Sequence, residues 1–387
     1  MKGHIRKRGK NSYAIILDIG RDGNGIRLQK WHSLKGTRKQ AEAYCAKLVT
    51  ELNLGTYIAP AAYNTGEYLD RWLESHVQTS LSAKTAERYK ELIEQHIKPA
   101  IGSIPLTKLR PMEIQQFYAK ALAGGCKRKA GGLSKQSVLH MHRLLHVAMK
   151  HSVQWHLRST NPLNGVVSPK PDHKEMRALT PPDVSALLRA LNESRLRLPV
   201  LTALATGLRR GELLALRWGN VDLDRAALQV RETLEETKEG VRFKEPKTKS
   251  GRRLLQFSPL LAEELRRHRA QQSERRLKLG AAYANKDLVF SLDDGKAWSP
   301  DNFSSEFAGF VRKSNLPHFR FHDLRHTHAS QLIHEGVSIK VVSARLGHSK
   351  IGITLDTYGH VMPGADETAV LKIEGWLQNV VPKSENT

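Results

Sequence analysis

Residues 205–218 read ATGLRRGELLALRW and predict a break between two helices beside a pair of arginines. Gly207 is expected to end one helix, because glycine tolerates the backbone conformation that follows a last helical turn. A second helix begins near Arg210, and the leucines that follow can anchor it in a core. Arg209 is therefore expected at a helix junction. An ordinary solvated surface arginine is the alternative.

A second motif, FHDLRHTHAS, occupies residues 321–330. His322 and Arg325 are three residues apart and share one face of a helix. Arginine offers a planar fork for a phosphate, and the imidazole adds a donor. A zinc site formed by His322, His326 and His328 is the alternative. No H-E-x-x-H pattern or cysteine completes such a site, so no metal or other cofactor is expected.

A third motif, LGHSKIGITLDTYGH, occupies residues 346–360, where His348 follows a helix stop and Tyr358 comes ten residues later. A lone tyrosine usually belongs to a core or an interface. Together with two arginines, two histidines and a lysine from the expected hairpin segment EPKTKSGRR at 245–253, it forms a plausible metal-free set for attack on a phosphodiester. Only about one free tyrosine in 10³ is ionised at pH 7, so such a site must activate the phenol.

The length and charge of the chain point to several domains that bind a polyanion. The chain has 387 residues, a formal net charge of +24 and 40% hydrophobic residues, enough for packed cores. A net charge of +8 falls in residues 1–60, +9 in 61–171 and +7 in 172–387. Nucleic acid is the expected partner, with simple solubility as the alternative.

The number of cysteines and the hydropathy of the chain indicate the cellular compartment in which the protein works. Cys45 and Cys126 are far apart, which excludes a disulfide scaffold and fits a reducing compartment. No apolar run approaches ~18 residues, so no membrane span is expected. The basic first residues are followed by an alternating pattern of polar and apolar residues instead of the continuous apolar stretch of a signal peptide. A cytoplasmic location is therefore predicted.

Three domains are expected in a mainly helical α+β chain. Residues 1–60 predict strands at 13–19 and 26–34 and then a helix from Thr37 to Leu52, a plausible DNA-reading module or a small core without a ligand. Residues 61–171 predict a helical bundle, in which one helix ends before Pro99 and a proline-rich linker precedes a boundary near 170. Residues 172–387 predict a mixed, mostly helical domain. Its short strands are expected at 227–231, 241–244 and 253–257.

The motifs together resemble the tyrosine recombinases of the phage integrase family. The family pattern is Arg, Lys, His-x-x-Arg, His or Trp, and then Tyr. It matches here as Arg209, Lys247, His322, Arg325, His348 and Tyr358. The match covers about residues 175–370. By arrangement, the middle segment is similar to the helical, SAM-like core-binding domain of the family. The first segment resembles the arm-binding domain of integrases from phages and integrative elements.

The resemblance implies site-specific recombination through a 3′-phosphotyrosyl intermediate formed by Tyr358. Arg209 and Arg325 would clamp the nonbridging oxygens of the phosphate. Lys247 would protonate the leaving 5′-oxygen, with Lys249 as the alternative. His322 would assist proton transfer, and His348 would hydrogen-bond the phosphate. Glu212, three residues after Arg209 at the usual acidic position of the family, is expected to be a supporting residue.

The resemblance also implies double-stranded DNA with core and arm sites as the partner. A homotetramer on two duplexes is expected. Residues 365–380 could pass to a neighbouring protomer or pack on their own chain. The implied role is integration or excision of a phage genome or mobile element, with viral genome integration among its forms. The sequence does not separate a phage from a conjugative element, and it leaves open whether accessory excision or DNA-bending proteins take part. The competing readings are a monomeric topoisomerase-like enzyme, a DNA-binding regulator with an inactive catalytic domain and a host chromosome-dimer resolvase. The complete set of reactive side chains and the basic first segment argue against them.

Overall fold

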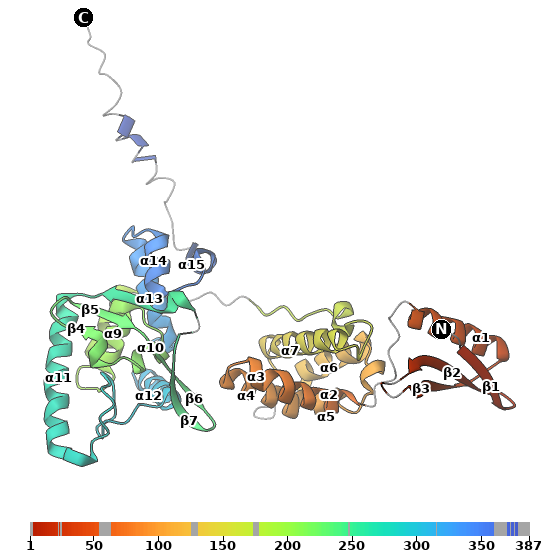
Figure 1. Ribbon diagram of the computed structural model, residues 1–387. Coiled ribbons are helices and arrows are strands. Elements are labelled where there is room, and N and C mark those ends of the chain that lie inside the picture. Colours follow the sequence, from red (N-terminus) through yellow and green to blue (C-terminus); the bar gives the residue numbers. More distant parts are fainter. Residues whose placement is uncertain are drawn as a thin grey trace, which may run out of the picture. The chain divides into compact units, whose positions relative to one another are not determined.

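The computed structural model describes residues 3–21, 23, 25–53, 63–124, 131–172, 178–246, 248–314, 316–359, 370–371, 373–374 and 376–377. The chain divides into two compact units, Met1–His173 and Lys174–Thr387 (Figure 1). The predicted fold class, a mainly helical α+β chain with small sheets, is confirmed. The domain boundaries expected at residues 60 and 171 remain predictions.

The first unit begins with an antiparallel sheet, in the order β1 (Gly3–Gly9), β2 (Ser12–Arg21) and β3 (Arg27–Lys35), followed by α1 (Arg38–Asn53). Ile15 and Leu17 of β2 are buried in one cluster with Cys45 and Leu48 of α1, because alternate strand residues point to the same face. The prediction missed β1. Its sequence, GHIRKRG, has a single large apolar residue, so it carries almost no alternating hydrophobic signal.

The rest of the first unit is a helical bundle with α2 (Thr65–Trp72), α3 (Gln78–Ser80), α4 (Ala83–Leu92), α5 (Lys98–Ile101), α6 (Pro111–Gly124) and α7 (Lys135–Gln154). The expectation that a helix ends before Pro99 is wrong. A wider π-helical turn at Ile93–Ile97 leads into α5, and Pro99 lies in the first turn of α5, where its missing N–H is tolerated.

The second unit contains α8 (Pro181–Ala190), α9 (Arg197–Thr206), α10 (Arg210–Leu214), α11 (Pro259–Leu279), α12 (Pro300–Lys313), α13 (Phe321–His334), α14 (Ile339–Leu346) and α15 (Ile351–Tyr358). Figure 1 shows α11 along one side of this unit and α14 and α15 beside α13. Leu213, Leu214 and Leu324 are fully buried in its core. The predicted anchoring of α10 by its leucines is therefore confirmed.

Two small antiparallel sheets complete this unit. One sheet has the order β4 (Val221–Asp222), β5 (Ala227–Val230) and β8 (Arg253–Gln256), and the other pairs β6 (Thr233–Thr237) with β7 (Gly240–Lys244). The expected hairpin at 245–253 is wrong, because β7 and β8 belong to different sheets. Pro246 follows β7 and has no N–H with which to continue the ladder. None of the helices in the described ranges has the length and hydropathy to cross a membrane.

Candidate functional site

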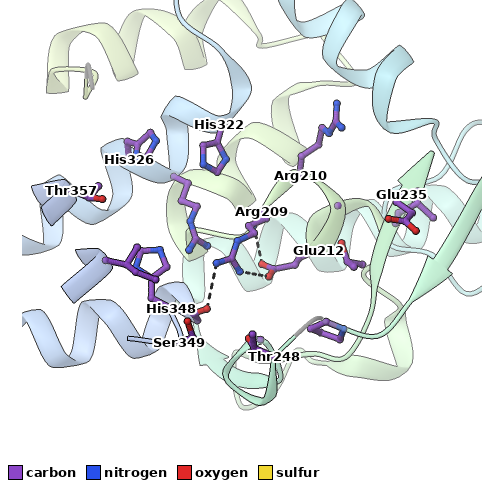
Figure 2. Close-up of a pocket in the computed structure, with 18 of the residues that line it drawn as sticks. Arg209, Arg210, Glu212, Glu235, Thr248, His322, His326, His348, Ser349 and Thr357 are labelled. Atoms are coloured by element: carbon purple, nitrogen blue, oxygen red, sulfur yellow. Dashed lines mark hydrogen bonds and ion pairs between the residues drawn. The ribbon is translucent and has the colours of Figure 1, made fainter. Parts of the chain in front are cut away.

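A pocket of about 720 Å³ opens in the second unit where α10, α13 and α15 approach one another (Figure 2). Five of the six predicted site residues line it: Arg209, His322, Arg325, His348 and Tyr358. The sixth, Lys247, lies outside the described residues. The backbone of its alternative, Lys249, forms the start of a single 3₁₀ turn. The fold thus brings together side chains from motifs that lie far apart in the sequence.

Arg325 projects from α13 and is only 3% exposed. Its Nη1 donates to the carbonyl of Gly207 at 2.7 Å, and its Nη2 donates to the carbonyl of Leu346 at 2.6 Å. These carbonyls lie at the C-terminal ends of α9 and α14, where helices carry partial negative charge. Two helix ends therefore hold this guanidinium in a fixed orientation.

Arg209 precedes α10 at its N-cap position and is more accessible, with 39% of its side chain exposed. Figure 2 shows it in contact with Glu212, whose Oε1 accepts from Nη1 at 2.8 Å. Its Nη2 donates to the carbonyl of Gly347 at 3.4 Å. The expected supporting place of Glu212 beside Arg209 is thus observed.

Arg253, which the sequence analysis did not single out, also belongs to this network. Both of its terminal nitrogens donate to Glu212, at 2.9 and 3.2 Å, and its Nε donates to the carbonyl of Arg345 at 2.6 Å. It is the first residue of β8, after the lysine-bearing segment. In a basic stretch of sequence, nothing distinguishes a buried, paired arginine from one that is exposed to solvent.

The positive charge of the pocket exceeds the negative charge that faces it. Burial would raise the pKa of Glu212, but Arg253 and Arg209 hold it below its usual range, so the carboxylate is ionised. Burial and the nearby Arg209 guanidinium lower the pKa of Arg325 to about 9, which leaves it protonated at pH 7. An anion bound between Arg209 and Arg325 would relieve their repulsion, and a phosphate fits this geometry.

The two predicted histidines are neutral at pH 7. Desolvation, with His326 and Arg325 nearby, lowers the pKa of His322 to about 4, although the residue keeps contact with solvent. Desolvation and the positive charges of Arg325 and Arg209 lower the pKa of His348 to about 4. Neutral imidazoles can offer an N–H to a phosphate without adding to the charge repulsion.

Tyr358 is the last residue of α15 and is 2% exposed, with its side chain at the wall of the pocket. Its hydroxyl lies 2.7 Å from Nδ1 of His326. Burial raises the pKa of Tyr358 to about 12, an effect that Arg325 opposes. The phenol is therefore fully protonated at neutral pH, and its use as a nucleophile requires that the proton be removed.

His326 is the second residue of the site that lies outside the family motif, and the sequence alone suggests it only as a metal ligand. It lies four residues after His322, and the two rings meet edge to face with centroids 4.9 Å apart. The i,i+4 spacing on one helix face was the signal that could have found it.

The histidines of the zinc alternative make other contacts. His326 contacts Tyr358, and Nδ1 of His328 lies 2.7 Å from the carbonyl of Leu204. In the part of the chain that the structure describes, no group of three or more His, Cys, Asp or Glu side chains could hold a metal ion. The set of cations, imidazoles and a phenol is suited instead to covalent attack on a phosphodiester.

Comparisons with known proteins agree with this chemistry. The model of the phage integrase family matches residues 177–364, and that of the phage integrase N-terminal SAM-like domain matches residues 65–122. A tyrosine recombinase XerC-like protein of Caldanaerobacter subterraneus is 29% identical, over 95% of this chain and 97% of the relative. The ICEBs1 integrase of Bacillus subtilis is 25% identical, over 96% of this chain and 100% of the relative.

The fold has a solved counterpart in the Tn1549 transposon integrase, in complex with a circular intermediate DNA. The TM-score is 0.67 with 19% sequence identity, and the match covers 81% of this chain and 100% of that chain. At this level of identity the likeness concerns the fold.

Proposed function

The chain belongs to the phage integrase family of tyrosine recombinases, and on that premise we propose how its pocket breaks and rejoins DNA. The enzyme is a site-specific DNA recombinase. The observation that carries the mechanism is the convergence of Arg209, Arg325, His348 and Tyr358 on one pocket with excess positive charge. A scissile phosphate bound there would meet both guanidiniums beside the phenol.

In the proposed first step, the hydroxyl oxygen of Tyr358 attacks the phosphorus. A new O–P bond forms to the 3′-phosphate, and the bond from phosphorus to the 5′-oxygen breaks. Arg209 and Arg325 bind the nonbridging oxygens and neutralise the charge that develops on them. Because helix ends already orient Arg325, little reorganisation is needed during the reaction.

The leaving 5′-oxygen needs a proton, and we assign its delivery to Lys247 as general acid. His348 donates a hydrogen bond to the phosphate. Its Nδ1 lies 2.8 Å from Thr354 Oγ1, a contact that orients the ring. His322, at the exposed side of the pocket, assists proton transfer.

The covalent intermediate makes an external energy source unnecessary. The phosphotyrosyl ester retains the energy of the broken phosphodiester, so the 5′-hydroxyl of a partner strand can attack it and release Tyr358. The same residues serve in reverse, because resealing passes through the same charge distribution. Repetition on the second pair of strands integrates or excises a DNA element such as a phage genome.

We assign arm-type DNA binding to one face of the sheet β1–β3. Register pairing places Arg6 opposite Ala14 and Trp31 opposite Ile16, so these residues share the face opposite Ile15 and Leu17, which pack with α1. Trp31 is 50% exposed, and the guanidinium of Arg8 lies 5.5 Å from its ring centroid. Exposed cations beside an aromatic ring suit contact with DNA.

Assembly follows the family pattern of four protomers on two duplexes, each binding a core site through the bundle of α2–α7. Leu371, Ile373 and Trp376 are exposed, which supports their transfer to a neighbouring protomer. Excision factors or DNA-bending proteins would set the direction of the reaction. We place this activity on DNA in the cytoplasm of a bacterial or phage-infected cell.

The direct test replaces the nucleophile. Tyr358→Phe is expected to shift core-site DNA in a gel but to trap no covalent adduct on a nicked suicide substrate, whereas the wild-type protein traps the adduct with or without EDTA. An adduct in the Tyr358→Phe variant would assign the nucleophile to another residue. Loss of wild-type cleavage in EDTA, restored by Mg²⁺, would instead favour a metal-dependent nuclease.

A further inference from the structure

The hydrogen bond between His326 and Tyr358 leads to a role that the motif residues do not cover. We propose that His326 is the general base that accepts the proton of the Tyr358 hydroxyl as this oxygen attacks DNA. The inference rests on the proposed function, because it assumes that Tyr358 is the nucleophile.

Geometry is the first support. The hydroxyl oxygen of Tyr358 and Nδ1 of His326 are 2.7 Å apart, within the range needed for direct proton transfer. The contact joins α13 to α15, and both residues line the pocket together with Arg325. By contrast, His322 meets His326 edge to face, so His326 stands between His322 and the phenol along this chain of contacts.

Protonation states give the second support. With a pKa of about 12, only about one Tyr358 in 10⁵ is ionised at pH 7, so a base in contact with the phenol has a large effect. Burial lowers the pKa of His326, with Asp323 opposing this and Arg325 and Arg320 adding to it, so the imidazole is neutral and able to accept a proton. Nδ1 accepts from the hydroxyl when the ring proton is on Nε2.

Of the charged groups around His326, Asp323 stabilises a transient imidazolium, whereas Arg325 and Arg320 oppose it. The charged and titratable groups around this ring are Arg320, His322, Asp323 and Arg325 on or next to α13, His348 after α14, and Tyr358 on α15. The bound phosphate adds negative charge to this set during the reaction. An imidazolium formed beside it is therefore better stabilised than in the DNA-free protein.

The proposed transfer balances over the complete reaction. In cleavage, the phenol proton moves to Nδ1 of His326, and Lys247 supplies a different proton to the 5′-oxygen. In resealing, the imidazolium returns its proton to the departing phenol oxygen of Tyr358. The 5′-hydroxyl that attacks gives its proton to Lys247, so both groups regain their starting states.

The test measures single-turnover cleavage of a nicked suicide substrate at saturating protein and at several pH values. Asn at position 326 places an amide oxygen near the position of Nδ1, so it can accept a hydrogen bond but cannot take up the proton. His326→Asn is expected to cleave roughly 10²–10⁴-fold more slowly at pH 7.5. The deficit should shrink as the pH rises, because the phenol then ionises without a base.

The matched control is His334→Asn, since His334 is exposed at the end of the same helix. It is expected to cleave at the wild-type rate. A second arm uses His326→Ala with added imidazole, which should restore part of the cleavage rate, whereas imidazole should not change the rate of His334→Ala. This rescue reports on proton transfer and is not expected from a purely structural residue.

Two results would overturn the inference: a His326→Asn variant with the rate and pH profile of the wild type, or a slow variant whose deficit is the same at every pH and whose His326→Ala counterpart is unaffected by imidazole. In either case, loss of the adduct in Tyr358→Phe would leave the proposed function intact. An adduct in Tyr358→Phe would show that the proposed function itself is wrong.

Discussion

Glu212 and Arg253 form an ion pair of 2.9 Å in which neither side chain is more than a tenth exposed. The pair joins α10 to β8. The same carboxylate also accepts from Arg209, so it sets the position of a guanidinium in the pocket. We therefore expect Arg253 to influence cleavage through Glu212, as a positioning residue.

Loss of this pair should reduce both stability and cleavage. Arg253→Met leaves a buried carboxylate with one of its two partners and is expected to lower the free energy of unfolding by about 3 kcal/mol in urea titrations. Cleavage should fall roughly 10²-fold, because Arg209 loses its fixed position. Arg267→Met removes the ion pairs of an exposed arginine with Glu263 and Glu264, neither of which touches the pocket, and should leave both measurements nearly unchanged. Equal effects of the two substitutions would contradict the positioning role.

Alanine substitutions at two glycines distinguish the cost of backbone strain from the cost of steric crowding by neighbouring side chains. Gly207 and Gly336 both have positive φ, +68° and +77°. An alanine Cβ at position 207 would lie 2.6 Å from Cδ2 of His328, whereas at 336 nothing lies within 4 Å. Gly336→Ala is expected to cost about 1 kcal/mol of unfolding free energy and to leave cleavage intact.

Gly207→Ala should cost about 3 kcal/mol, since overpacking adds to the strain. It should also slow cleavage, because the carbonyl of Gly207 holds Arg325. Urea titration and suicide-substrate cleavage provide the two measurements. If Gly207→Ala and Gly336→Ala had the same unfolding free energy and the same cleavage rate, the close packing around Gly207 would affect neither stability nor cleavage.

His328 should make the protein less stable in acid. It is 7% exposed, and burial lowers its pKa to about 4, with its backbone contact to Leu204 opposing this. The unfolded chain, with a pKa near 6.5, binds more protons between pH 4 and 6.5, so the free energy of unfolding falls as the pH drops through this range. Above pH 6.5 His328 is neutral in both states, and the free energy of unfolding is higher there than below pH 4 by roughly 3 kcal/mol from this residue.

The measurement is urea unfolding at pH 7.5, 5.5 and 4.5. His328→Asn keeps a donor for the carbonyl of Leu204 but does not titrate, so its stability should change less with pH than that of the wild type. Parallel pH dependences in the two proteins would assign the acid sensitivity to other groups.

A sulfur substitution identifies the general acid. DNA with sulfur in place of the leaving 5′-oxygen should restore cleavage by Lys247→Ala, because a thiolate leaves without a proton. Lys244 also lines the pocket, paired with Glu235, and serves as a control whose alanine variant should gain nothing from sulfur. Rescue of Lys249→Ala, and not of Lys247→Ala, would reassign the role.

The exposed face of the N-terminal sheet should bind DNA through its cations. Arg6→Ala is expected to weaken arm-site binding and to reduce the slope of log affinity against log salt by about one. Lys39→Ala removes the same charge from an exposed position on α1 and should have little effect. Cleavage of a core-site suicide substrate should be unchanged in both. Equal losses of arm-site binding would show that only net charge matters.

Much of the local structure followed from the sequence. Gly207 ends α9 with positive φ, as predicted, and His348 follows the end of α14 at Gly347. These features depend on residues adjacent in the chain. The path around Pro99 and the strands β1, β4 and β6 were missed, because a π-helical turn and short or highly charged strands carry no regular hydrophobic period.

The sequence by itself predicted which side chains carry the chemistry, since their types and order are properties of the chain. Arg209, His322, Arg325, His348 and Tyr358 were all expected, and all line the pocket. Only the tertiary structure showed which neighbours control them: the helix ends that hold Arg325, the Arg253–Glu212 pair, and His326 against the phenol. Such contacts join residues far apart in the chain, 118 positions between Arg325 and Gly207 and 138 between Arg209 and Gly347. Packing of helices from distant parts of the chain sets these distances and the burial that shifts each pKa, and no local pattern encodes either.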